Sequence, residues 1–124
     1  MLSNWESIDR YLTKRGLKIG PPRLCQTGGG RHTVKIGDGK LKISGHYFGY
    51  GRDYGSMDSD VVGIARKLEF VALMPNGPIS ELFCGYLIRV FIKDGTRIEN
   101  PSSELTRIHK DHCHVALKRH SLLI

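Results

Sequence analysis

Hydrophobic and polar positions near the start of the chain follow the period of an α-helix. The apolar residues that share one face at this spacing are Trp5, Ile8 and Leu12. Ser3 and Glu6 stand three residues apart, as in a capping box, where two side chains satisfy backbone N–H groups at a helix start. Gly16 is a natural C-terminal cap, and prolines follow it at 21–22. We therefore expect a helix over residues 4–15.

Alternation of polar and apolar residues then predicts two β-hairpins. Each is centred on an Asp-Gly pair, Asp38-Gly39 in the first and Asp94-Gly95 in the second, and such pairs favour the tight turn of a hairpin. The expected strands are 31–36 and 41–44 for the first hairpin, and 86–92 and 97–99 for the second. Polar residues follow one face of the first hairpin, so we expect that face to meet water.

The middle of the chain fits two patterns at once. Residues 61–68 place apolar side chains on one helical face. The alternating apolar residues that fit a strand are Leu68, Phe70 and Ala72. We expect a short helix that leads into a strand and ends at a proline-flanked turn over 75–78, after which a further strand covers 79–83.

The last quarter of the chain predicts a short helix and a final strand. Residues 101–104 have the composition of a helix start, followed by apolar Leu105 and Ile108. The alternating residues that predict the final strand are Cys113, Val115 and Leu117. The pattern is α+β: an N-terminal helix packed on a mainly antiparallel β-sheet built from hairpins, with one or two further short helices, in a single compact domain over residues 1–124.

Composition favours a folded intracellular protein. Of the 124 residues, 40% are hydrophobic and 25% are charged, which is typical of globular domains and excludes a disordered chain. Residues 1–8 lack the pattern of a signal peptide, and no apolar run is long enough for a transmembrane segment. The three cysteines are widely spaced and odd in number, which suits a reducing compartment. We expect a cytoplasmic protein with free thiols.

Positive charge is concentrated in the first half of the chain. The net charge is +7, and residues 1–56 hold ten Lys or Arg against four Asp or Glu, a net +6. Residues 57–100 hold five basic residues against six acidic ones, a net −1. A localised basic field attracts polyanions, and nucleic acid in particular. The alternative is that the charge serves solubility alone.

The most distinctive stretch is a glycine-rich aromatic segment over residues 45–55. It combines four aromatic residues, one histidine and one arginine with four glycines. Exposed rings stack on unpaired bases, and glycines let the backbone approach a ligand, so a loop of this kind suits single-stranded nucleic acid. The alternative is a loop whose rings cover the edge of the core.

These observations favour a small basic protein that binds nucleic acid, with RNA or single strands favoured and RNA preferred to DNA. The residues predicted to supply charge are Arg23, Arg31, Lys35, Lys40, Lys42 and Arg52. Those predicted to stack on bases are Tyr47, Tyr50 and Tyr54. No cofactor is expected, because the glycine run at 28–30 lacks the Lys-Ser or Lys-Thr continuation of a phosphate-binding loop.

Two other classes of function stay open, so enzymatic activity is left undecided. One is a metal-independent ribonuclease, or a toxin-like RNase, in which His32 and His46 serve as catalytic acid and base on a basic domain. The other is a phage or viral accessory or matrix-like domain that binds a protein partner or forms a homo-oligomer. The apolar residues 122–124 motivate this interpretation, because an exposed apolar end commonly docks against a partner.

The C-terminal region is rich in histidine. His109, His112 and His114, with Cys113 among them, are residue types that bind zinc. No Cys-x-x-Cys pair accompanies them, and His112 and His114 share a face only if the segment is extended. We therefore predict no metal site.

Overall fold

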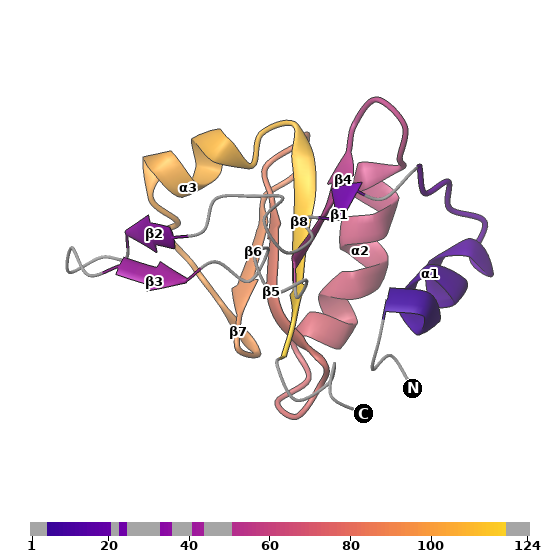
Figure 1. Cartoon of the computed structure of the whole chain (residues 1–124), viewed down its shortest axis with the longest axis horizontal. Coiled ribbons are helices and arrows are strands. Elements are labelled where there is room, and N and C mark those ends of the chain that lie inside the picture. The colour runs from indigo at the N-terminus through magenta and orange to yellow at the C-terminus, as the bar shows by residue number, and fades with distance from the viewer. Residues whose placement is uncertain (1–4, 21–22, 25–32, 36–40, 44–50, 119–124) are drawn as a thin grey trace.

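The computed structural model describes residues 5–20, 23–24, 33–35, 41–43 and 51–118, and within 23–43 it describes the backbone alone. In chain order the elements are α1 (Trp5–Thr13), β1 (Arg23–Leu24), β2 (Thr33–Lys35), β3 (Leu41–Ile43), β4 (Gly51–Gly55), α2 (Val61–Ala72), β5 (Ile79–Cys84), β6 (Val90–Lys93), β7 (Thr96–Arg97), α3 (Ser103–Ile108) and β8 (His112–Leu117). Figure 1 shows how they are arranged.

The described strands form one sheet of six strands and one separate pair. In the larger sheet the order is β1-β4-β8-β5-β6-β7, and each neighbouring pair is antiparallel. The second sheet pairs β2 with β3. α1 and α2 lie on one side of the larger sheet, and α3 lies on the other (Figure 1). The α+β fold predicted from the sequence is confirmed.

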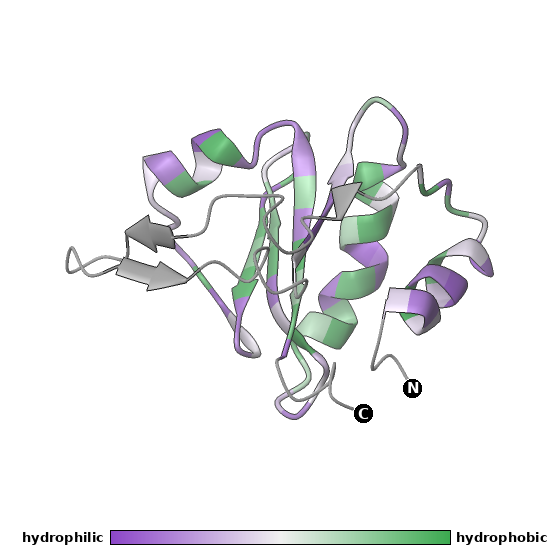
Figure 2. Ribbon diagram, in the orientation of Figure 1, coloured by the Kyte–Doolittle hydropathy of each residue, from purple (hydrophilic) through white to green (hydrophobic). Residues whose placement is uncertain are grey.

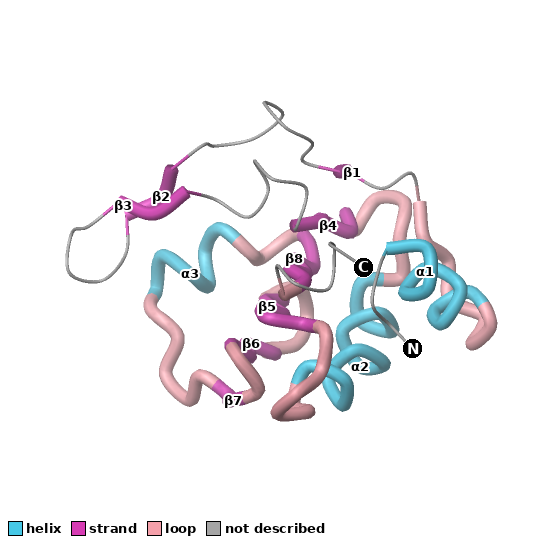
Figure 3. The backbone as a smooth tube through the Cα atoms, turned by 60° about the horizontal axis from the view of Figure 1, so that its bottom comes forward, coloured by secondary structure: helices cyan, strands magenta, loops and turns pink. Residues whose placement is uncertain are grey.

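The core lies between α2 and the larger sheet. The buried residues of α2, at helical spacing, are Val61, Ile64, Ala65, Leu68, Val71 and Ala72. They belong to one apolar cluster with Leu82 of β5, Ile92 of β6 and Val115 of β8. Figure 2 shows α2 as largely hydrophobic and α1 as more hydrophilic, and Figure 3 shows α2 beside the strands. Removing this apolar surface from water is the main force that holds the layers together.

α2 continues to Ala72, so the strand predicted after its first turns is wrong. The alternation of Leu68, Phe70 and Ala72 does not mark a strand, because Phe70 is 74% exposed whereas the other two residues are buried. Val71 instead extends the buried stripe at helical spacing. A helix of twelve residues therefore reaches the turn at 75–78.

Residues 51–55 form a strand, β4, where the sequence pattern predicts a loop. β4 pairs with β1 on one side and with β8 on the other, which places it inside the sheet. Successive side chains of a strand point to opposite faces. Arg52 and Tyr54 accordingly point toward the helices α1 and α2, where both are buried, and Asp53 points to the opposite face.

The strands of both predicted hairpins pair as expected, although they are shorter. In the first hairpin, Val34 lies opposite Lys42. In the second, Asp94 and Gly95 have φ of 49° and 80°, the left-handed backbone that a two-residue type I′ turn requires. Residues 86–89, predicted to begin its first strand, precede β6.

The remaining elements follow their sequence signals. α1 ends before Gly16, whose φ of 78° is that of a helix cap, and Ser102 caps α3 by accepting from the Leu105 N–H. Cys84 and Cys113 are buried free thiols that lie directly opposite each other on β5 and β8. None of the described helices is long and apolar enough to cross a membrane.

Candidate functional site

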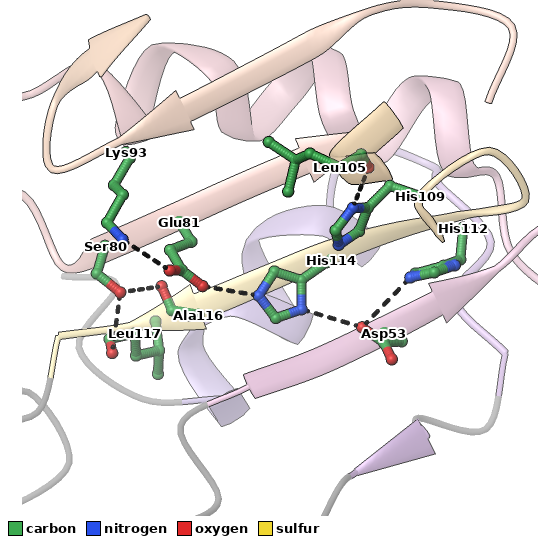
Figure 4. Close-up of polar contacts among 10 residues, drawn as sticks. All are labelled: Asp53, Ser80, Glu81, Lys93, Leu105, His109, His112, His114, Ala116 and Leu117. Atoms are coloured by element: carbon green, nitrogen blue, oxygen red, sulfur yellow. Dashed lines mark hydrogen bonds and ion pairs between the residues drawn. The ribbon is translucent and has the colours of Figure 1, made fainter. Parts of the chain in front are cut away.

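The sheet face opposite α1 and α2 carries a group of ionisable side chains. β4 contributes Asp53, β5 contributes Glu81, β8 contributes His112 and His114, and the turn before β8 contributes His109. We call these five residues the histidine–carboxylate site (Figure 4). Its position follows from the strand order, because β8 lies between β4 and β5.

The alternation of β8 explains why its histidines reach this face. Cys113 and Val115 are fully buried against α2, so the residues between and before them, His112 and His114, point to the other side. The register places Asp53 directly opposite His114 on one side. It places Phe83 opposite His114 on the other side, and Glu81 lies two residues along from Phe83.

His114 connects the two carboxylates. Its Nδ1 lies 3.2 Å from the Asp53 carboxylate and its Nε2 lies 3.0 Å from the Glu81 carboxylate. Burial alone would lower the pKa of this imidazole, but the hydrogen bonds to Asp53 and Glu81 outweigh burial and raise the pKa to about 9. His114 is therefore a buried imidazolium at neutral pH, and both ring N–H groups donate to carboxylates.

His109 has the opposite electrostatic character. Burial lowers its pKa to about 4, with a further contribution from the nearby charge of His114, although a hydrogen bond to the Leu105 carbonyl opposes the shift. Nδ1 donates to that carbonyl over 2.7 Å, which leaves the other nitrogen of the neutral ring as the acceptor. The His109 ring packs edge-on against Phe83 at 5.3 Å and lies 5.5 Å from the His114 ring.

His112 is the most accessible histidine of the site. Its Nδ1 donates to the Asp111 carboxylate over 2.7 Å, and its Nε2 lies 3.8 Å from the Asp53 carboxylate. A cavity of about 360 Å³ opens beside it. The described residues that line this cavity are Asp53, Gly55, Ser56, Met57, Ile108, Asp111 and His112.

This arrangement supplies the parts of acid–base chemistry. The pKa of His109 is lowered and the pKa of its neighbour His114 is raised. Acid–base pairs in enzymes commonly consist of two groups whose environments shift their pKa values apart in this way. Asp111 fixes the orientation of His112 as a carboxylate orients an imidazole in catalytic dyads. Among the described residues no group of three or more His, Cys, Asp or Glu side chains could hold a metal ion.

Two of the predicted nucleic-acid-binding residues lie in the core. Arg52 is 4% exposed, forms an ion pair with Asp9 of α1, and stacks over the Trp5 ring at 4.6 Å. Tyr54 is also buried, and burial raises the pKa of its phenol above the usual range. Neither side chain presents a surface to a phosphate or a base, so we do not propose either as a binding residue.

Of the other predicted site residues, the structure describes only the backbone of three, and the backbone of Arg23 lies opposite Asp53 in the β1–β4 pair. His32, His46, Arg31, Lys40, Tyr47 and Tyr50 lie outside the described residues. Arg23, Lys35 and Lys42 belong to β1, β2 and β3, whose side chains also lie outside the description. Their predicted roles stay predictions.

Sequence reasoning missed Asp53, Glu81 and Asp111 as members or neighbours of the site. The one usable signal was the final strand itself, because buried Cys113 and Val115 imply that the flanking histidines share the opposite face.

Comparison of the chain with protein-family models, with curated proteins and with solved structures finds no match. The fold and the site themselves define the protein as an α+β protein with a buried imidazolium held between two carboxylates.

Proposed function

We propose that the protein binds nucleic acid, RNA in preference to DNA and single strands in particular. The proposal rests on a basic stretch that no acidic residue interrupts: residues 10–37 contain seven Lys or Arg and no Asp or Glu. Such a stretch neutralises phosphates and releases their counterions, which supplies most of the affinity of non-specific nucleic-acid binding.

The described part of this stretch supports the proposal with exposed charge. Lys14, Arg15 and Lys18 are exposed at and after the end of α1. Arg15 lies 3.6 Å above the Tyr11 ring, and the Tyr11 hydroxyl donates to the main-chain carbonyl of Lys67 on α2. Tyr11 thus links the end of α1 to α2 beside these exposed cations. We call Lys14, Arg15 and Lys18 the α1 basic surface.

The preference for single strands rests on the aromatic segment of the sequence. Tyr47 and Tyr50 remain the predicted stacking residues, since a base of any kind can stack on a phenol ring. A duplex offers no unpaired base to such rings. The proposal therefore predicts tighter binding to single-stranded RNA than to duplex DNA of equal length.

Replacing Lys14 and Arg15 together with glutamine is expected to weaken binding to single-stranded RNA and to lower its salt dependence. Each phosphate of a single strand that the variant no longer neutralises lowers the slope of log affinity against log salt by about 0.7, so the slope of the double variant falls by up to about 1.4. Fluorescence-anisotropy titrations of a labelled oligonucleotide at several salt concentrations measure both quantities.

The matched control for this variant is Arg89→Gln with Arg107→Gln, which removes the same charge from exposed positions, one just before β6 and one on α3. It is expected to keep the slope nearly unchanged. An equal loss of affinity in both double variants would show that net charge, and not the α1 basic surface, determines binding. Affinity that does not change with salt would contradict the proposed function itself.

A second candidate function is a metal-independent ribonuclease. The hydrogen bond from His112 to Asp111, with the His112 ring beside a cavity, favours it. A general base needs this orientation and an approach for the substrate hydroxyl. His32 and His46 remain the histidines predicted for this role from the sequence.

Incubation of a generic RNA with the protein and a chelator tests the ribonuclease. If cleavage occurs, the His112→Ala variant is expected to lose about a hundredfold or more in rate, as removal of a general acid or base usually does. Loss of cleavage in His32→Ala or His46→Ala, with His112→Ala unaffected, would assign catalysis to the sequence-predicted histidines. Intact RNA after long incubation would remove this candidate.

A further inference from the structure

The cavity beside His112 has the size and the mixed lining of a small-ligand pocket. Its volume of about 360 Å³ falls in the range of about 300–1,000 Å³ that is typical of such pockets. The described lining residues come from β4 and the residues after it (Asp53, Gly55, Ser56 and Met57), from α3 (Ile108), and from the start of β8 and the residue before it (His112 and Asp111). The lining therefore combines apolar side chains with carboxylates and an imidazole.

Asp111 is the most exposed of the described acidic groups that line this cavity. Its side chain is 73% exposed, and one carboxylate oxygen accepts the His112 Nδ1–H. An ionised carboxylate has about four lone-pair sites, so most of its accepting capacity remains. The hydrogen bond from His112 holds the pKa of Asp111 below its usual range, which keeps the group ionised at neutral pH. Asp111 thus offers an oriented pair of acceptors.

Two of the described residues that line the cavity are exposed and apolar. Met57 is 90% exposed and Ile108 is 46% exposed, although both are large hydrophobic side chains. A thioether and an aliphatic chain pack well against the face of a flat aromatic ring. A ligand with a planar body and hydrogen-bond donors along one edge satisfies both parts of the lining.

We propose that this cavity binds a guanine base of single-stranded nucleic acid, with Asp111 accepting from the N1–H and the N2 amino group of the base. Guanine is the base whose Watson–Crick edge presents two adjacent donors, and single-stranded bases are read along that edge. In adenine and in cytosine, the atom beside the amino group is an acceptor. This acceptor would face the carboxylate, and no hydrogen would lie between the two. This inference rests on the proposed function.

A guanidinium group of a cationic peptide presents a similar pair of donors, but the charge of the protein disfavours it. The net charge of +7 repels a basic peptide and attracts a polyanion. The net positive charge of the protein supplies attraction to phosphates, and the cavity supplies recognition of a base. Asp111 repels the phosphates of the strand. The backbone therefore stays outside the cavity, and only a base enters it.

The test compares three RNA pentamers that differ only in the central base: UUGUU, UUAUU and UUIUU, where I is inosine and lacks the N2 amino group. At one salt concentration, UUGUU is expected to bind about tenfold tighter than the other two, as a bidentate contact to a base typically provides. In the Asp111→Asn variant this preference is expected to disappear, with the affinity for UUAUU nearly unchanged. Met57→Ser is expected to weaken UUGUU binding as well.

The matched control is Asp94→Asn, which makes the same change of charge in a turn whose positive φ asparagine tolerates. It is expected to keep the preference for guanine. Equal, salt-sensitive binding of the three pentamers would overturn the guanine pocket and leave the proposed function intact. The absence of binding to any pentamer would overturn both. A third outcome is that an arginine-rich peptide competes with the pentamers only when Asp111 is present, and that the pentamers bind without a preference for guanine. This outcome would assign the cavity to a protein partner.

Discussion

Replacement of His114 by glutamine is expected to destabilise the fold by about 3–5 kcal/mol at neutral pH, the usual cost of breaking a buried ion pair from one side. The imidazolium lies between Asp53 and Glu81 within hydrogen-bond distance of both. Without it, two carboxylates face each other across β8 with no cation between them. Lys93, 3.6 Å from the far oxygen of Glu81, offsets only part of this loss because its side chain is 45% exposed.

The pH dependence of stability identifies the charge of His114 as the cause. A histidine has a pKa of about 6.5 in an unfolded chain, and His114 has a pKa of about 9 in the folded protein. A raised folded pKa contributes stability that is fully present below pH 6.5 and is lost as the pH rises through 9. At about 1.4 kcal/mol per pKa unit, this contribution is about 3 kcal/mol. The variant is expected to lack this alkaline decline.

Urea unfolding at a series of pH values measures these differences. The informative control is the triple variant His114→Gln, Asp53→Asn and Glu81→Gln, which removes the carboxylates together with the cation. It is expected to be more stable than the single variant, because no uncompensated charge remains. If the single variant is no less stable than the triple variant, and the alkaline decline persists, the charge of His114 does not hold β4 and β5 to β8.

Most elements of the fold could be predicted because their signals are local. The Asp94-Gly95 pair requires a tight turn wherever it stands between strands, and Ser102 caps a helix through a hydrogen bond to a residue three positions on. Two of the errors arose where tertiary packing decides. Phe70 points to solvent and thereby breaks an apparent strand pattern. β4 is a strand because β1 and β8 pair with it, in spite of its glycines.

The site could be predicted only in part, because its members come from strands far apart in sequence. The shared face of His112 and His114 follows from the alternation of β8 alone. Their partners do not: Asp53 and Glu81 are 61 and 33 residues from His114, and only the strand order brings them to it. No local pattern distinguishes these two carboxylates from the other acidic residues of the chain.

Arg52 is a residue that the sequence predicted to belong to a site and that the fold places elsewhere. Apart from Asp53, the nearby residues in the sequence are glycines and tyrosines, a context that suggests an exposed phosphate-binding residue. In the fold its guanidinium lies beneath α1, with the Trp5 ring above it and Asp9 as its ion-pair partner. Arg52 therefore contributes to the attachment of α1 to the sheet, and α1 in turn positions Lys14 and Arg15 of the basic surface.

Replacement of Asp9 by asparagine is expected to destabilise the fold by about 3 kcal/mol, the low end of the range for a buried pair because the Asp9 side chain is 31% exposed. An arginine cannot lose its proton in a protein, so Arg52 would remain a buried cation without its carboxylate. Its Nε is buried with no hydrogen-bond partner among the described residues, so the ion pair with Asp9 and the contact with the Trp5 ring stabilise the charge.

Urea unfolding of the Asp9→Asn and Glu6→Gln variants is compared. The comparison separates loss of the Arg52 ion pair from the general loss of a negative charge on α1. Glu6 pairs with Arg10 on the exposed side of the helix, and a surface pair of this kind contributes less than about 1 kcal/mol. Adding Arg52→Met to Asp9→Asn is expected to recover most of the stability, because the buried cation is then replaced by an apolar side chain of similar length. If Asp9→Asn costs no more than Glu6→Gln, the Arg52 ion pair does not attach α1, and the position of the basic surface depends on apolar packing by Ile8 and Leu12 instead.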